Sequence, residues 1–416
     1  MKLSKSSQIL ILMSLFYLSF LSNNSEDKIK KRVHIPKDKL KIINPLLKNL
    51  KTAISNGNAE KATLISKEIT NTLGLFAGVP SDSPTYFSPI ERYPPSSKSV
   101  LKLWLDLEKK LKNEYLWNST PRGNPANMRT GLRGTGRPII AYAILYRING
   151  NRRYYEHVKK GANYLLKLQN KNGLFPFPDL RNKHKLFGTM IKKLLKQKPE
   201  ALKNGWIVDD VNGDMQYDNG ICGVAMIEAY NVTKDNVYLK SAGKASEWAL
   251  KRPISLNWNY NAFSVWLLAK YAKASGENKY LISAIKKLKL GILPGQMKNG
   301  RWFDPHNAKL VYHGIIVRAM LEVYKNIEND NIFKKELRHS ISIAIDNASN
   351  EIKNNGASSI STSTEMLSEA LYYLGENENW EEALNININA SLHIRNNNKA
   401  PNVGLYLANY IKYLKQ

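Results

Sequence analysis

From about Val100 onward, apolar residues recur at spacings of three and four, and runs that alternate strictly between apolar and polar residues are few. This period predicts helices, and no sheet is needed to explain it. Upstream, two shorter stretches with the same period predict helices over roughly 38–55 and 58–73. The stretch 78–97, dense in Pro and Ser, predicts a loop. The pattern therefore predicts an all-α chain in which a short helical N-terminal arm precedes a larger helical domain.

A repeated unit organises the larger segment. An apolar helix ends in an aromatic residue, a short polar loop follows, and a second aromatic residue opens the next helix. The five aromatic pairs are Tyr146 and Tyr154, Tyr230 and Tyr238, Tyr271 and Tyr280, Tyr324 and Phe333, and Tyr373 and Trp380. An insertion at 171–217 interrupts the series between the first two units. Each unit predicts a helical hairpin, and such hairpins must stack because one alone cannot bury its apolar face.

A second recurrence follows two of the outgoing helices. Gln169 precedes Gly173 and Phe175 with the same spacing that separates Gln296 from Gly300 and Trp302. The glycine is expected to end the helix in a left-handed turn, and the aromatic side chain to fold back onto the hairpin.

This Gln-x-x-x-Gly-x-aromatic ending resembles the helix ends of α/α-toroid proteins, which include six-hairpin glycosidases, polysaccharide lyases and terpene cyclases. The resemblance implies that residues 98–416 form an (α/α) toroid of stacked helical hairpins, a catalytic domain preceded by an arm and linker at 23–97. In such a toroid, the loops that lead into the inner helices supply a cleft with polar and aromatic groups. A fold alone does not specify a function, so the function must be argued from particular residues.

The first residues have the order of a secretory signal. Lys2 and Lys5 precede the apolar run Ile9–Leu21, and the polar stretch 22–25 follows. We expect residues 1–22 to act as a signal peptide and the protein to be secreted or periplasmic. The alternative is an uncleaved anchor, although the run is short for a bilayer span, and no other stable membrane insertion is expected. Export argues against ATP, NAD and CoA chemistry, and no GxGxxG or P-loop pattern is present, so no cofactor is expected.

The charge balance favours anionic partners. Lysine and arginine number 62 against 34 acidic residues, a formal net charge of +28. A codon bias toward Lys, Asn and Ile, visible in the run 396–398, is the competing explanation. Nucleic acid is not expected, because the lysines are spread along the chain and no recognised module is present. The single cysteine, Cys222, excludes an intramolecular disulfide.

The most acidic loop, 206–220, lies directly before a predicted helix. Asp214 and Asp218 are candidates for the acid and base of glycoside cleavage, which needs two carboxyl groups. Calcium binding between Asp210 and Asp218 is an alternative, although Met215 occupies the usual Gly position and the terminal Glu is missing. The third interpretation is structural: residues of this loop cap the following helix and form its turn.

Two further loops carry candidate chemistry. The first alternates amides with aromatic rings, a pattern suited to sugar hydroxyls and pyranose faces: Asn257, Trp258, Asn259, Tyr260 and Asn261. The second contains Trp302, Asp304, His306 and Asn307, followed by Tyr312 and His313. Neighbouring residues on a helix face about 100° apart, so at most one of Tyr312 and His313 is expected to project into a cleft. The competing reading of both loops is structural, with capped helices and core aromatics.

Three arginines, Arg129, Arg133 and Arg137, lie in a Gly-rich loop and at the start of the next predicted helix. They are suited to bind a carboxylate or sulfate of a substrate. They could equally pair with the acidic loop and hold the shape of the cleft. The sequence does not decide between these roles.

The leading hypothesis is a secreted carbohydrate-active enzyme that cleaves an anionic, uronate-containing glycan. In a lyase, Arg129 or Arg133 with Asn259 neutralises the uronate, His306 is the base, and Tyr260 or Tyr312 is the acid. The other candidate sugar contacts are Asn257, Trp258, Asn261, Trp302 and Asn307. In an inverting hydrolase of the same fold, Asp214 or Asp218 pairs with Asp304. A non-catalytic helical-repeat protein that binds glycan or protein is the hypothesis from a different class.

Overall fold

The computed structural model describes residues 35–80, 84–87, 90–114, 132–182, 184–210, 215–328, 331–396 and 405–415. The predicted signal segment 1–22, Arg129 and Asp214 lie outside the described residues, so those predictions stay as they are. Within the described part of the chain, no helix is long and apolar enough to span a membrane.

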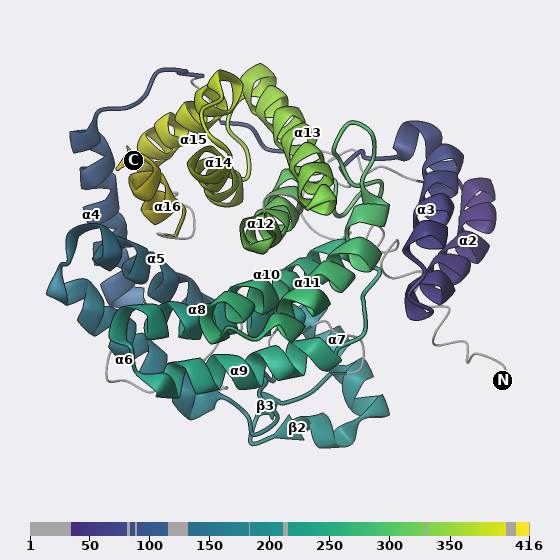
Figure 1. Cartoon of the computed structure of the whole chain (residues 1–416), viewed down its shortest axis with the longest axis horizontal. Helices are drawn as coiled ribbons and strands as arrows, with labels where there is room; N and C mark the ends of the chain where they lie inside the picture. The colour runs from purple at the N-terminus through teal and green to yellow at the C-terminus, as the bar shows by residue number, and fades with distance from the viewer. Residues whose placement is uncertain are drawn as a thin grey trace.

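Twelve helices form two concentric rings (Figure 1). The inner helices are α5 (Arg133–Asn149), α8 (Gln216–Thr233), α10 (Trp258–Ser275), α12 (Leu310–Asn326), α14 (Ile360–Leu374) and α16 (Leu405–Tyr413). Each inner helix packs on the next, and α16 packs on α5, which closes the ring. The outer helices are α4 (Ser97–Glu114), α6 (Arg152–Leu168), α9 (Asn236–Lys251), α11 (Asn278–Gly291), α13 (Ile332–Asn355) and α15 (Glu378–Asn396). This closed arrangement is the α/α toroid that the sequence predicts.

The five aromatic-flanked loops are the inner-to-outer turns, as predicted. Each joins an inner helix to the following outer helix, and all five are short. The rings flanking the third turn, Tyr271 and Tyr280, meet edge-on with centroids 4.7 Å apart. Because these connections are short, the longer connections gather at the opposite end of the inner helices.

The Gln-x-x-x-Gly recurrence links neighbouring outer helices. The Gln169 amide donates to the carbonyls of Gly173 and of Ser241 on α9, each at 2.9 Å. Gln296 repeats this with Gly300, at 3.3 Å, and with Ser340 on α13, at 2.9 Å. One detail of the prediction is wrong: α6 ends at the extended Gln169, and the positive-φ glycine lies in the turn that follows.

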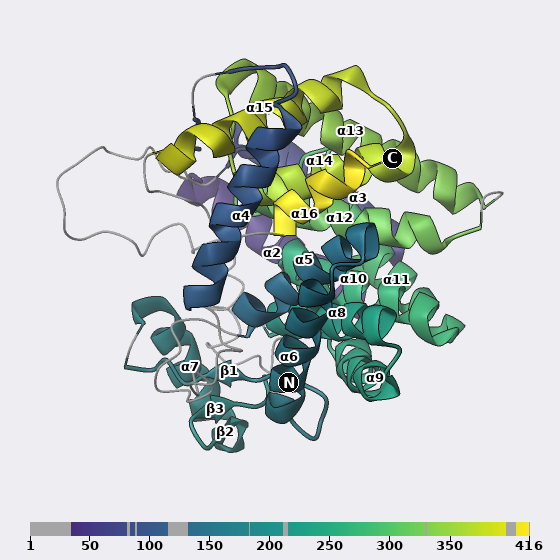
Figure 2. The same ribbon diagram turned by 90° about the vertical axis from the view of Figure 1, so that its left-hand side faces the viewer.

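The insertion between α6 and α8 contains a small sheet, although the apolar pattern predicts none. Its strands are β1 (Phe177–Pro178), β2 (Leu202–Lys203) and β3 (Trp206–Ile207), antiparallel in the order β1-β3-β2. It also carries α7 (Lys185–Gln197) and the 3-10 turn η3 (Pro199–Ala201). Figure 2 shows α7 and the strands together at one corner of the molecule, away from α13 and α15. Two-residue strands are too short to produce an alternating pattern.

The N-terminal arm is a helical hairpin of α2 (Lys37–Ser55) and α3 (Ala59–Leu73), close to the predicted ranges, followed by the 3-10 turn η1 (Gly74–Phe76). The Asn58 side chain caps α3 by accepting from the backbone N–H of Lys61. The arm lies against one side of the ring, where α3 contacts the 3-10 turn η4 (Leu293–Gly295) and α11 (Figure 1). The arm is therefore docked on the toroid.

Candidate functional site

One end of the inner ring is closed by buried charges near the last turns of its helices. Glu228 on α8 accepts from Arg147 on α5 at 2.6 Å and from Lys270 on α10 at 2.8 Å. Lys270 also lies 3.7 Å from Glu322 on α12, which accepts from Lys325 at 2.8 Å. Burial would raise the pKa of Glu322, but Lys270 and Lys325 lower it to about 2, so the carboxylate stays charged.

The same chain of contacts continues to the two remaining inner helices. The Lys325 ammonium lies 4.1 Å from the ring centroid of Tyr373 on α14, whose hydroxyl accepts from Lys412 on α16 at 2.8 Å. All six inner helices thus contribute to this layer, which we call the ionic floor. A ligand on the toroid axis must therefore approach from the other end.

At that other end, a pocket lies on the axis between α5, α8, α10 and α12. We call it the axial pocket. Its lining residues are Arg137, Ile221, Ala262, Phe263, Trp266, Ile315 and Arg318. It combines two guanidinium groups with aromatic and aliphatic walls, as expected of a site for a ligand with an anionic group and apolar faces.

A collar of polar residues surrounds the mouth of the axial pocket. Four first-turn residues each precede a lining residue by three or four positions, and so share its helix face. They are Arg133 above Arg137, Tyr217 above Ile221, Tyr260 above Phe263, and Tyr312 above Ile315. Tyr217 and Tyr260 are the only residues that are not fully buried in the first three turns of α8 and α10. The collar therefore brings together three of the predicted site residues: Arg133, Tyr260 and Tyr312.

Arg133 and Asp218 form an ion pair with two hydrogen bonds. The guanidinium donates through Nε to Oδ1 at 2.9 Å and through Nη2 to Oδ2 at 2.6 Å, and it lies 3.9 Å from the ring centroid of Tyr217. Burial alone would lower the pKa of Arg133, but Asp218 raises it above its usual value. The structural reading of the arginines, pairing with the acidic loop, therefore holds for Arg133. The pair leaves Asp218 poorly placed as an acid or base, because its two oxygens are occupied.

Arg318 is paired on the opposite wall, with carboxylates that the sequence analysis missed. It donates to Glu365 and, at 2.9 Å, to Glu369, and its guanidinium lies 4.9 Å from the ring centroid of Trp266. Arg318 interrupts a buried apolar stretch of α12, and that interruption is the signal that could have identified it. Glu365 follows a run of Ser and Thr residues in α14 and has no such signal in the sequence.

Arg137 has a different environment. Its Nη2 donates to the Tyr217 hydroxyl at 3.2 Å. No carboxylate among the described residues forms an ion pair with it, whereas Arg133 and Arg318 both have such partners. Arg137 therefore presents a guanidinium to the axial pocket that no described acid neutralises.

A second pocket lies between the N-terminal arm and the loops before α10 and α12. We call it the arm pocket. Its lining residues are Leu47, Leu50, Leu256, Asn257, Trp258, Phe303, Asp304, His306 and Asn307. It brings together five residues that the sequence analysis selected from two separate loops: Asn257, Trp258, Asp304, His306 and Asn307.

Asp304 is a titratable group of the arm pocket with a shifted pKa. Burial raises the pKa of its carboxyl to about 6, although hydrogen bonds from Asn307 oppose the shift. The Asn307 backbone N–H donates to Oδ1 at 2.9 Å, and its amide donates to both carboxylate oxygens at 3.0 Å. A carboxyl with this pKa can hold or release a proton in mildly acidic to neutral solution.

The His306 ring, which lines the arm pocket, stacks on Tyr312 of the collar. Their centroids are 4.1 Å apart at an interplanar angle of 28°. His313 instead is buried, and its Nε2 lies 2.8 Å from the carbonyl oxygen of Ala344. Of the adjacent pair Tyr312 and His313, only Tyr312 is left at the mouth, in line with the expected angular offset.

The amides of the two loops bind chiefly to each other. Asn259 donates to Asn257 and to Asn307, each at 2.9 Å, and is fully buried. Asn261 donates to the carbonyls of Ser255 and Gly291, and the Trp302 indole N–H donates to the Ile292 carbonyl in the core.

Neither pocket is lined by Asn259, Asn261 or Trp302. For these three, the structure supports the packing reading over sugar contact. Their side-chain N–H groups are committed to holding loops together, because a buried donor needs a hydrogen-bond partner.

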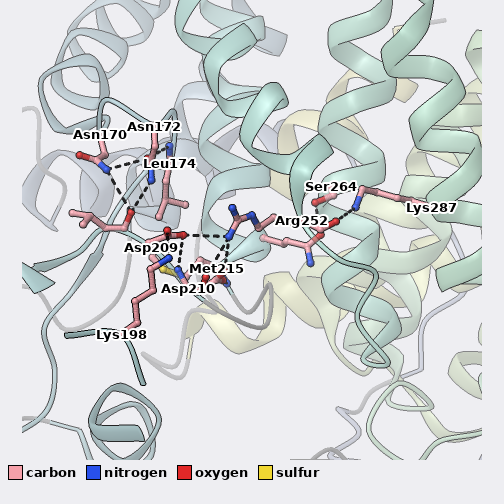
Figure 3. Close-up of polar contacts among 12 residues, drawn as sticks. Asn170, Asn172, Leu174, Lys198, Asp209, Asp210, Met215, Arg252, Ser264 and Lys287 are labelled. Atoms are coloured by element: carbon pink, nitrogen blue, oxygen red, sulfur yellow. Dashed lines mark hydrogen bonds and ion pairs between the residues drawn. The ribbon is translucent and has the colours of Figure 1, made fainter. Parts of the chain in front are cut away.

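The loop before α8 is fixed by a cluster of charges (Figure 3). Arg252 donates to Asp209 Oδ1 and to the Asp210 carbonyl, both at 3.2 Å, while Lys198 reaches Asp209 at 2.5 Å. The Asp210 carboxylate accepts from the backbone N–H of Met215 at 2.7 Å, immediately before α8 begins. This cluster sets the start of the helix that carries Tyr217.

The same contacts bear on calcium, which the sequence analysis weighed for the loop from Asp210 to Asp218. The Asp210 carboxylate accepts from the backbone N–H of Met215, and Asp218 is bound by Arg133. Across the described ranges, no group of three or more His, Cys, Asp or Glu side chains is arranged to hold a metal ion. The structure thus gives both end carboxylates of the loop other partners.

No known protein family and no curated protein sequence matches this chain. Among solved structures, a polysaccharide lyase is similar at 12% identity and a TM-score of 0.49, over 76% of this chain and 99% of that one. A GH76 α-mannanase from Bacteroides thetaiotaomicron is similar at 11% identity and a TM-score of 0.49, over 76% of this chain and 94% of that one. An unsaturated glucuronyl hydrolase variant from Streptococcus agalactiae is similar at 11% identity and a TM-score of 0.49, over 80% of this chain and 96% of that one. Resemblance at this level does not identify a substrate or a reaction.

Proposed function

We propose that this chain is an exported carbohydrate-active enzyme that cleaves an acidic, uronate-containing glycan by β-elimination. The axial pocket is the observation that carries the proposal, because Arg137 lies there beside the aromatic walls formed by Phe263 and Trp266. A guanidinium group binds a carboxylate through paired N–H donors, and aromatic rings pack against the apolar faces of sugars.

His306 of the arm pocket and a tyrosine of the collar supply the proton transfers of an elimination. His306 accepts the proton on C5 of the uronate, the electron pair forms the C4–C5 double bond, and the C4–O bond breaks. Tyr312, stacked on His306, donates a proton to the departing oxygen, and Tyr260 is a second candidate for that role. Arg137 replaces Arg133 as the group that neutralises the carboxylate, because Asp218 already occupies Arg133.

Hydrolysis is the second candidate reaction, and the environment of Asp304 favours it. A carboxyl with its pKa raised to about 6 suits the acid that protonates a leaving oxygen. The partner carboxylate would be Asp214 or Asp218, and a separation of roughly 6.5–9.5 Å from Asp304 is the requirement for inversion. The bonds from Arg133 to Asp218 count against Asp218 in this role.

Export is part of the proposal and rests on the basic and apolar order of residues 1–22. N-terminal sequencing of the protein recovered from outside the cytoplasm tests it. A mature chain that begins shortly after residue 22 supports export with cleavage. Recovery of the intact chain from the membrane would point to the anchor instead.

The decisive experiment is incubation of the purified protein with uronate-containing and neutral polysaccharides, with ultraviolet absorbance and reducing ends followed together. Absorbance from unsaturated uronate together with new reducing ends supports elimination. Reducing ends without absorbance indicate hydrolysis, and no change in either across the panel indicates the non-catalytic glycan-binding protein.

Variants then assign the residues. His306→Gln and Tyr312→Phe are each expected to lower kcat by about 100-fold or more, the usual contribution of a positioned acid or base. His339→Gln is the matched control, because His339 is exposed on the outer helix α13. Full activity in both His306→Gln and Tyr312→Phe would contradict the assigned roles and leave the reaction without its base.

A further inference from the structure

We propose that the axial pocket binds a single terminal acidic sugar, with its carboxylate on Arg137, so that the glycan is shortened from its end. This rests on the proposed function and adds to it the part of the chain that is recognised. Two observations carry it: the unequal pairing of the pocket's arginines, and the floor that closes the pocket.

The first observation concerns charge. Arg133 and Arg318 each have a carboxylate partner, so their attraction for a ligand anion is largely cancelled. Arg137 donates to the Tyr217 phenol and forms no ion pair with a described acid. Its remaining N–H donors are therefore the charged donors without a carboxylate partner that this pocket offers an incoming carboxylate, and the Trp266 indole N–H in the same pocket also lacks a hydrogen-bond partner.

The second observation concerns depth. Lys270 lies four residues after Trp266 on α10, and Glu322 lies four residues after Arg318 on α12, so each is one turn below a residue that lines the pocket. The ionic floor begins there. A polymer therefore cannot thread along the axis, and a sugar held against Arg137 must enter and leave by the mouth.

The two observations together define the ligand. A blind pocket with an anion-binding group one turn below its mouth accepts a chain end more readily than an internal residue, because an internal residue is linked on both sides. The aromatic wall of Phe263 and Trp266 suits the ring of that sugar, and the collar is then level with the bond to the next residue.

Binding is tested without turnover. Calorimetric titration with glucuronate and with glucose is expected to show binding of the uronate only, and Arg137→Gln is expected to weaken it by about tenfold or more. Arg137→Lys keeps the positive charge but loses the paired N–H donors of the guanidinium. This variant is expected to retain part of the affinity. Arg152→Gln on the outer helix α6, where the side chain is exposed, is the matched control and should bind as the parent does.

Equal affinity for glucose and glucuronate, or unchanged affinity in Arg137→Gln, would overturn the assignment of Arg137. Thermal melting without ligand verifies that each variant is folded. If uronate binding depends on Arg137 while no polysaccharide is cleaved, the assignment of Arg137 as the carboxylate-binding residue stands, and the enzymatic proposal fails together with shortening from the chain end.

The product distribution tests the chain-end part. Early release of single sugars from an acidic polysaccharide supports it, whereas an early ladder of mixed lengths would exclude it. If a glycan is cleaved with no dependence on Arg137, the enzymatic proposal stands and the inference is lost.

Discussion

At the scale of single residues, Asp304 shows how burial and hydrogen bonding compete. Asn307 donates three hydrogen bonds that favour the charged form of the carboxyl, yet burial in the arm pocket favours the neutral form and prevails. The arm contributes to that burial through Leu47 and Leu50. The acidity of this group is thus set partly by residues more than two hundred positions away.

A pH-dependent stability follows from this shift. The pKa of Asp304 rises from 3.8 to about 6 on folding, so the stability it contributes is fully present below pH 3.8 and is lost as the pH rises through 6. Asp304→Asn is therefore expected to be more stable than the parent above about pH 7, by about 1–3 kcal/mol, and equally stable near about pH 4. Urea unfolding at the two pH values measures the difference.

A stability difference that does not change between the two pH values would show that Asp304 titrates normally in the folded protein. Asp235→Asn is the matched control, because Asp235 caps α9 at an exposed position. Its effect is that of a lost charged cap on an exposed helix end.

At the scale of elements, the two glutamine turns attach neighbouring outer helices to each other. Gly173 has φ of +93°, and a Cβ there would lie 2.1 Å from the carbonyl oxygen of Lys244 on α9. Gly300 repeats the arrangement against Ile343 on α13, with 2.5 Å to its carbonyl oxygen. The recurrence in the sequence therefore records a contact between consecutive hairpins as well as a turn.

Gly173→Ala is expected to destabilise the protein by about 3 kcal/mol or more, because it adds a clash with rigid backbone to the strain of a positive φ. Gly150→Ala is the matched control, since Gly150 has φ of +66° and nothing within 4 Å of the added Cβ. It should cost only about 1–2 kcal/mol. Chemical denaturation of both variants compares the two costs, and equal losses would refute the proposed close contact.

The elements were more predictable from the sequence than the site. Aromatic pairs such as Tyr271 and Tyr280 identify the hairpin turns because each is a local signal within one connection. Arg133, Tyr260 and Tyr312 were also found, because they stand at helix starts. The partners of Arg318 were missed, because Glu365 is a neighbour only once the ring has formed. Residues such as Asn259 were overvalued, since a polar pattern does not reveal that the amides bind one another.

At the scale of the whole molecule, the toroid has one ionic end and one open end. The ionic floor links side chains of all six inner helices, charged on five of them and the Tyr373 phenol on α14, and each buried carboxylate in it has more than one cation nearby. Such a layer contributes little net stability, but removing one member leaves other charges buried without a partner. The floor therefore fixes how the helices are aligned near their ends.

Glu228→Gln is expected to lower the free energy of unfolding by about 3–5 kcal/mol, because Arg147 and Lys270 both lose their anionic partner. Glu156→Gln, in an exposed ion pair with Arg152, should change it by less than about 1 kcal/mol. Thermal or urea unfolding gives both values. Similar losses in the two variants would contradict the view that the floor is electrostatically isolated from solvent.

The contact between α16 and α5 has a consequence for how the pocket comes into being. Arg137 and the collar's Arg133 belong to α5, which begins the inner ring, and α16 completes the ring by packing on both α14 and α5. During synthesis, the inner ring cannot close until 405–413 have been made, and contacts between distant segments of a chain form late and slowly. The nascent protein therefore carries helical hairpins well before it carries a binding site.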